Sequence, residues 1–170
     1  MKADKILVPL DGSELAEAAI ARATETAASK SSTLLLMRAA EARTLPGTDV
    51  IGAQIEAVQE AEGYLAAVKA KLEKQGAQKV EANVWYGPAA TAIIEAAQMY
   101  KPDLIVMSTH GRSGLGRIIF GSVAESVLRG TTIPILLIRP AGAPVEPPSG
   151  PGTARPASTP EPRSKTEALR

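Results

Sequence analysis

The chain has 170 residues, a net charge of +1 and no cysteine, and 45% of its residues are hydrophobic. This length and composition fit one globular domain, and they exclude disulfide frameworks, cysteine nucleophiles and zinc sites built on thiolates. The single histidine excludes a site with several histidine ligands in one chain, and few aromatic residues with no basic block argue against nucleic-acid binding.

The sequence alternates between strand and helix patterns. In chain order, it predicts a strand over 5–10, a helix over 14 to about 29, a strand over 33–38, a long helix over 49–74, a strand over 79–86, a helix over 88–100, a strand over 103–108, a helix over 122–129 and a strand over 135–138. This alternation predicts an α/β fold, an open doubly wound parallel sheet of five strands with helices on both faces.

The composition changes sharply after Pro140. Residues 141–170 contain seven prolines and almost no large apolar side chain, so they bury too little surface to offset the entropy of ordering. We therefore predict a folded domain over 1–140 and a disordered Pro-rich tail over 141–170. A passive, solubilising tail is favoured over a docking segment.

The start of the chain has no apolar signal-peptide region, and no apolar run reaches the roughly 18–20 residues that a membrane-spanning helix needs. We expect a cytoplasmic protein without a membrane partner.

A glycine-rich stretch follows the fourth predicted strand and ends in a helix. Glycines allow close approach of the backbone, and the N–H groups and dipole of a helix N-terminus favour phosphate. Gly116 and Gly121 have the glycine spacing of a Walker A loop, but Ser122 stands where its lysine should be, and no dinucleotide fingerprint is present. The stretch predicts a nucleotide site of another kind, with a flexible surface loop as the alternative.

Several polar residues have two interpretations. Ser122 begins a capping-box pattern, so it either caps the last helix, contacts phosphate, or does both. Asp11 either initiates the turn into the first helix or accepts hydrogen bonds from a ribose or a base, and Ser13 is the expected cap of that helix. His110 is expected to be an exposed loop residue rather than a catalytic base. Arg112 either pairs with phosphate or is solvated.

These residues resemble the universal stress protein family over about residues 4–140. Three stretches carry the resemblance: 6–14 (ILVPLDGSE), 102–107 (PDLIVM) and the loop from 110 to 122. The family's nucleotide-binding branch has the pattern Gly, two residues, Gly, nine residues, Gly and then Ser or Thr. Gly111, the nine residues after it and Gly121-Ser122 match this pattern, whereas Ser108 stands at its first glycine.

The resemblance implies the strand order 3-2-1-4-5, with ATP, alone or together with Mg²⁺, between the loops after strands one and four. It implies that the following residues surround the nucleotide: Pro9, Leu10, Asp11, Ala39, Met107, Ser108, Gly111, Arg112, Gly121, Ser122 and Val123. It also implies a homodimer, for which the apolar strand 135–138 is the expected interface.

Three functions follow from this sequence. An ATP-binding regulatory or stress-response module is favoured, without catalytic or metal-ligating residues of its own. One alternative is a slow ATPase or phosphotransferase. The other is an interaction protein with a vestigial nucleotide crevice, and the serine at position 108, where the family pattern has glycine, supports this alternative.

Overall fold

The structure is a computed structural model that describes residues 2–29, 31–42, 47, 49–76, 79–109 and 121–139. The predicted tail after residue 140 and most of the glycine-rich loop lie outside these residues. No helix within the described ranges is both long and apolar enough to cross a membrane.

The five predicted strands form one parallel sheet. They are β1 (Lys5–Pro9), β2 (Thr33–Ala40), β3 (Lys79–Tyr86), β4 (Leu104–Ser108) and β5 (Ile135–Ile138). Their order is β3-β2-β1-β4-β5, which confirms the order that the resemblance implies. Every pairing in this sheet is parallel, as expected when helices form the crossovers between successive strands.

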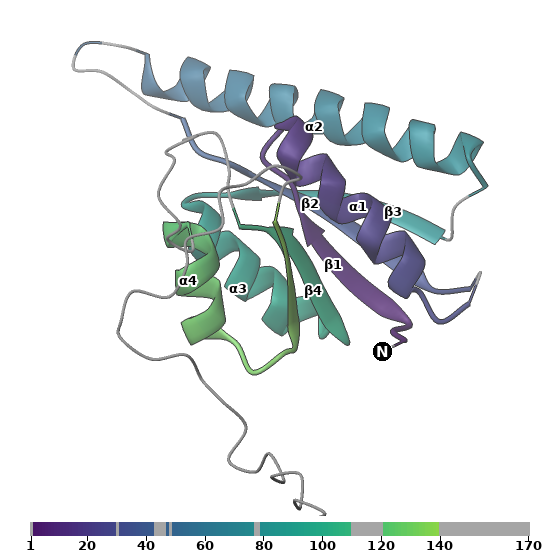
Figure 1. The fold of residues 1–170 in the computed structure, drawn as a ribbon. Coiled ribbons are helices and arrows are strands. Elements are labelled where there is room, and N and C mark those ends of the chain that lie inside the picture. The colour runs from purple at the N-terminus through teal and green to yellow at the C-terminus, as the bar shows by residue number, and fades with distance from the viewer. Residues whose placement is uncertain are drawn as a thin grey trace, which may run out of the picture.

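Four helices cover the two faces of this sheet (Figure 1). They are α1 (Glu14–Thr26), α2 (Val50–Lys74), α3 (Ala89–Tyr100) and α4 (Ser122–Gly130). Helices α1 and α2 pack on one face, and α3 and α4 pack on the other. The sheet is thus covered on both sides, which is the doubly wound arrangement predicted from the sequence.

Side-chain alternation along the strands explains the two cores. In β1, Ile6 and Val8 face α1 and α2, whereas Leu7 faces α3 and α4, and all three side chains are fully buried. A strand buried on both faces needs apolar residues at successive positions, so the unbroken run ILV is typical of a central parallel strand.

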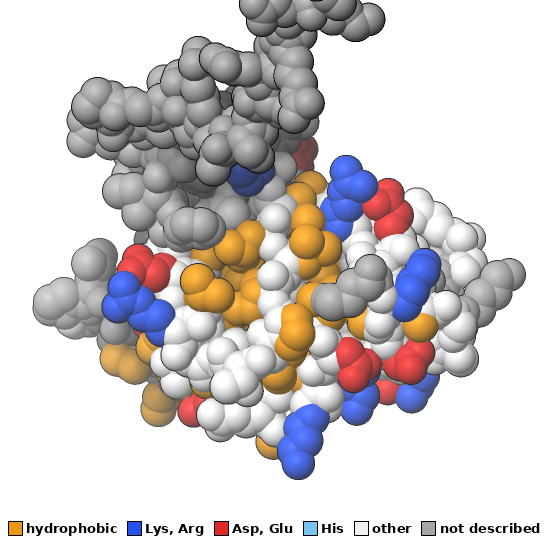
Figure 2. Space-filling view, turned by 60° about the horizontal axis from the view of Figure 1, so that its bottom comes forward, with side chains coloured by type: hydrophobic (Ala, Val, Ile, Leu, Met, Phe, Trp, Pro, Cys, Tyr) orange, Lys and Arg blue, Asp and Glu red, His pale blue; other side chains and the backbone are white. Residues whose placement is uncertain are grey.

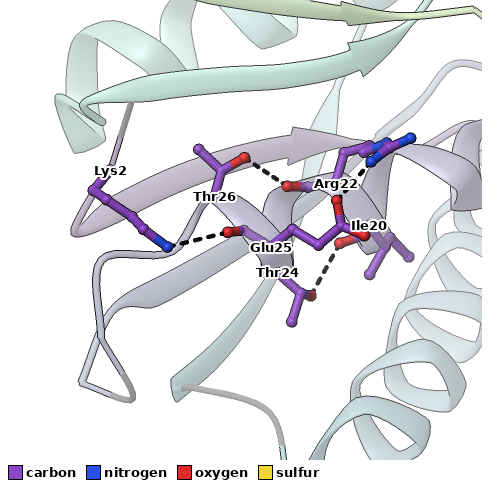
Figure 3. A network of polar contacts seen from close by, with 6 residues as sticks. All are labelled: Lys2, Ile20, Arg22, Thr24, Glu25 and Thr26. Atoms are coloured by element: carbon purple, nitrogen blue, oxygen red, sulfur yellow. Dashed lines mark hydrogen bonds and ion pairs between the residues drawn. The ribbon is translucent and has the colours of Figure 1, made fainter.

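Helix α1 ends at Thr26, three residues before the predicted end (Figure 3). The Thr26 hydroxyl donates to the carbonyl oxygen of Arg22 at 2.7 Å, and the Lys2 ammonium donates to that of Glu25 at 3.4 Å. These donors satisfy carbonyl groups of the last turn, and the cation near the C-terminus is favourable for the helix dipole. The predicted extension to Ser29 was therefore wrong.

Other boundaries differ by one or two residues. Strand β2 extends to Ala40, because its pairing with β3 continues two residues beyond the apolar run that marked it. The residues Asp49 and Pro88, predicted as the first helical residues, are the N-caps of α2 and α3. Gly130 is the last residue of α4 rather than the residue that follows it.

Candidate functional site

The strand order brings two loops that are far apart in the sequence to the same side of the sheet, the edge formed by the carboxyl ends of the strands. Strands β1 and β4 are neighbours, with Ile6 opposite Leu104 and Leu7 opposite Ile105. Parallel strands end at the same edge, so the residues after Pro9 and the residues after Ser108 emerge beside each other. Ligands of open α/β sheets bind at this kind of position, where the strand order reverses.

The turn after β1 is built around Asp11. Its Oδ1 accepts hydrogen bonds from the backbone N–H of Ser13 at 3.0 Å and from the Ser13 hydroxyl at 2.6 Å. The Ser13 Oγ in turn accepts from the N–H of Ala16 at 3.1 Å and caps α1, as predicted. Asp11 therefore initiates the turn. Its Oδ2 makes no hydrogen bond to the described residues, so the carboxylate can still accept one from a ligand.

The preceding residue fixes this turn to the sheet. The Leu10 N–H donates to the carbonyl oxygen of Met37 at 2.8 Å, and the Leu10 side chain is buried in the core under α1 and α2. Pro9 is the last residue of β1. These contacts hold the backbone of Asp11 against the centre of the sheet.

Ala39 was predicted to lie just past the second strand, but it lies inside β2. It stands opposite Trp85 in β3, and its side chain is half-buried on the α3 and α4 face. Its backbone is thus part of the ladder between β2 and β3 and lies at the same edge of the sheet as Asp11.

The end of β4 and the start of α4 meet at Thr109. Met107 is buried and Ser108 is half-buried at the end of the strand. The Thr109 N–H donates to the carbonyl oxygen of Ile138 at 3.0 Å, and the Thr109 carbonyl accepts from the N–H of Gly121 at 3.1 Å. The loop between Thr109 and Gly121 is therefore closed at its base by a backbone hydrogen bond.

Gly121 is needed for this close approach. A Cβ atom at Gly121 would lie 2.9 Å from the carbonyl oxygen of Thr109. The backbone conformation itself is ordinary, with φ at −51°, so the constraint is lack of space rather than strain. The family pattern places a glycine here, and the geometry gives the physical reason.

The prediction that Ser122 caps α4 was wrong. Gly121 is the N-cap, and Ser122 already belongs to the helix. Glu125, the expected partner in the capping box, pairs instead with Arg129 at 2.6 Å. Within the described residues α4 has no side-chain cap, so the N–H groups of its first turn remain available at the edge where β4 ends. Such a helix end is suited to an anion.

The remaining predicted site residues divide into two groups. Val123 lies in the first turn of α4, half-buried against the core under α3 and α4. Gly111 and Arg112 lie outside the described residues, as does His110. The predicted site residues at the ends of β1 and β4 and at the start of α4 thus lie at one edge of the sheet, whereas the predicted site residues of the loop 110–120 lie outside the described part of the chain.

A buried arginine near this edge was not predicted. The Arg38 side chain, in β2, is only 9% exposed, and its Nη2 donates to Glu60 Oε1 at 2.7 Å. Its guanidinium also lies 5.1 Å from the ring centre of Tyr64. Burial raises the pKa of Tyr64 to about 12, and the charges of Glu17 and Asp11 add to this shift. The available signal was an arginine inside the apolar strand TLLLMRAA.

No metal-ligating group of three His, Asp or Glu side chains occurs in the part of the chain that the structure describes.

The comparisons with known proteins identify the family. The sequence pattern of the universal stress protein family matches residues 2–139. The chain belongs to this family. Universal stress protein MJ0531 of Methanocaldococcus jannaschii is 31% identical over 138 residues, which cover 79% of this chain and 81% of the relative.

Solved structures of the family share the fold. The structure of MJ0577 from the same archaeon has a TM-score of 0.71 and 27% identity, and the match covers 82% of this chain and 97% of that one. A universal stress protein in complex with cAMP has a TM-score of 0.62 and 22% identity, with 80% of this chain and 97% of that chain covered. Members of the family with this fold thus include a nucleotide-binding protein.

The contact at Gly121 predicts opposite effects for two alanine substitutions. Gly121→Ala should lower the free energy of unfolding by about 1–3 kcal/mol, because the new methyl group is forced against the Thr109 carbonyl. Gly63→Ala is the matched control, since Gly63 lies inside α2 with open space at its Cβ position. It should raise stability by about 0.5–1 kcal/mol through helix propensity. Urea unfolding measures both, and equal effects of the two substitutions would contradict the packing argument.

Proposed function

We propose that this protein is an ATP-binding regulatory module of the stress response, with the nucleotide held between the loops after β1 and β4. The observation that carries the proposal is the first turn of α4. Among the described residues no side chain caps it, and it lies at the same sheet edge as the carboxylate of Asp11. A nucleotide needs both an anion site for its phosphates and a hydrogen-bond acceptor for its ribose, and the two are supplied by neighbouring loops.

Each end of the nucleotide has its own partners in this proposal. At the adenosine end, Asp11 Oδ2 accepts from the ribose, and the backbone of Ala39 contacts the base. At the phosphate end, N–H groups of Val123 and its neighbours and the Ser122 hydroxyl donate to oxygen atoms. The remaining proposed contacts are Pro9, Leu10, Met107, Ser108, Gly111, Arg112 and Gly121.

Binding rather than turnover is the proposed activity. Phosphoryl transfer needs a positioned nucleophile and a metal clamp, and the contacts proposed here serve binding, with Asp11 as the only carboxylate among them. Magnesium, if present, would be held chiefly by the phosphates. The proposed regulatory effect is a change in partner binding or dimer stability when the crevice is occupied.

The ligand can be identified directly. The protein should be purified without added nucleotide and denatured, and the released small molecules should be separated and identified by mass spectrometry. Stoichiometric ATP is expected. A preparation without nucleotide that also fails to bind ATP, ADP, AMP and cAMP by calorimetry would contradict the proposal and favour a vestigial crevice.

A pair of serines in α4 tests the phosphate end. Ser122→Ala should weaken ATP binding about tenfold, because a hydrogen bond to a charged group is lost. Ser126→Ala is the control, since Ser126 lies one turn further along α4, is also exposed, and donates its hydroxyl to the Ser122 carbonyl at 2.8 Å. Calorimetry should show unchanged affinity for the control, and an equal loss in both variants would contradict the assignment.

We also propose a homodimer through β5. This strand is at the edge of the sheet, and its four aliphatic side chains are all half-buried. Figure 2 shows one face of the molecule on which hydrophobic side chains lie near the middle, with charged side chains to either side of them. An apolar strand edge left open would invite uncontrolled pairing.

Sedimentation velocity tests the dimer. The unmodified protein should sediment as a dimer at micromolar concentration. Leu137→Lys should shift it to monomer, because a charge would enter the apolar region around β5. Since Leu137 also packs against the core under α3 and α4, circular dichroism should first show that this variant is folded. The exposed Leu128→Lys substitution in α4 serves as the control. A monomeric unmodified protein would refute this proposal. The cytoplasmic location and the domain boundary near residue 140 stay predictions.

A further inference from the structure

The long helix α2 has an apolar seam that continues beyond the sheet. Four residues of its second half pack into the core, namely Ala61, Leu65, Val68 and Leu72. Their spacing of four, three and four residues extends toward the N-terminus to Val58, Gln54 and Ile51. Such alternating spacing keeps all these positions on one side of a helix. The seam that holds α2 on the sheet therefore continues into the first half of the helix, where its side chains are less buried.

The N-terminal end of α2 extends beyond the carboxyl edge of the sheet (Figure 1), whereas Glu60 still lies over β2, where it pairs with Arg38. In the first half of the helix, Ile51 is 72% exposed and Ile55 is 52% exposed. Together with Gln54, Val58 and Gln59, they line a shallow groove of about 360 Å³. We call the stretch 50–59 the α2 overhang. Apolar side chains at helical spacing that remain exposed in this way are typical of an interaction site.

The charges around the groove indicate which partner fits. From Asp49 to Val68 the chain contains four acidic residues and no lysine or arginine. Glu60 is paired with Arg38, whereas Glu56 and Glu62 have no ion pair among the described residues. Because the whole chain carries a net charge of +1, this acidic surface is a local feature and not a property of the protein as a whole.

We propose that the α2 overhang binds a partner helix with an apolar stripe flanked by lysines or arginines. The apolar stripe would enter the groove at Ile51 and Ile55, and the flanking cations would pair with Glu56 and Glu62. Recognition of an amphipathic helix in an apolar groove is an established mode of peptide binding, in which apolar anchors provide affinity and charges provide orientation and specificity.

Two other occupants fit the same groove less well. A second copy of α2 would bring acidic residues against acidic residues, which is repulsive. The tail of this chain has four basic and three acidic residues, and Val145 and Leu169 are the only large aliphatic residues in 141–170, so it cannot form an apolar stripe flanked by cations. The chemistry of the surface therefore favours a different protein as the partner.

Fluorescence anisotropy with synthetic helices tests the proposal in the full-length protein. The probe is a labelled amphipathic peptide of leucine and lysine, about 18 residues or five helical turns long. Two comparison peptides are used. In the first, serine replaces every leucine and the lysines are kept, and in the second, glutamate replaces every lysine and the leucines are kept. The leucine–lysine peptide should bind saturably with 1:1 stoichiometry, and both comparison peptides should bind at least about tenfold more weakly.

Matched variants locate the binding surface. The double substitution Ile51→Ser and Ile55→Ser should weaken binding at least about tenfold without unfolding the protein, because both side chains are exposed. Glu56→Gln with Glu62→Gln should weaken it severalfold, with the difference vanishing near about 0.5 M salt. Met99→Ser, at an exposed site on α3, is the control and should have no effect.

Three results would overturn the proposal. The first is equal binding of the acidic and basic peptides, and the second is unchanged affinity in the Ile51→Ser and Ile55→Ser variant. The third is conversion of a dimer to a monomer by that same variant, which would assign the surface to a second copy of the chain. None of these measurements contains nucleotide, so failure here leaves the proposed ATP site untouched.

Discussion

Parallel pairing of β1 with β4 is the constraint on which the candidate site depends. It joins strands from opposite halves of the chain and places the turn at Asp11 beside the end of β4 at Ser108. The pairing is held by side chains buried on both faces, so the position of the two loops is fixed by the core rather than by contacts between the loops themselves. The shared position of the two loops is thus a consequence of sheet order.

A second constraint acts at the start of α4. The hydrogen bond from Gly121 to Thr109 returns the chain to the end of β4, and Thr109 in turn is bonded to Ile138 at the end of β5. These contacts direct the first turn of α4 toward the sheet edge, and no side chain in the described part of the chain caps it. In the proposed function a ligand phosphate binds this helix end, which makes occupancy and local stability interdependent.

The fold could be predicted from the sequence because strands buried on both faces produce unbroken apolar runs and the helices produce 3.6-residue periodicity. The N-cap of α4 could not be predicted, because a serine with a glutamate three residues later fits a capping box whether the backbone of the serine is extended or helical. Arg38 was missed because burial of a charge depends on a partner far along the chain, here Glu60. The exposure of Ile51 was missed because a periodic pattern does not show where the sheet beneath it ends.

The central claim, that nucleotide binds between the loops after β1 and β4, is tested most directly by an amide proton–nitrogen NMR titration with ATP. The account predicts saturable shifts in the amides of Asp11, Ser108 and Thr109 and of the first turn of α4, from Ser122 to Ala124. Amides of the α2 overhang and of the opposite, amino edge of the sheet should remain unchanged. Shifts confined to those other regions, or no shifts at millimolar ATP, would contradict it.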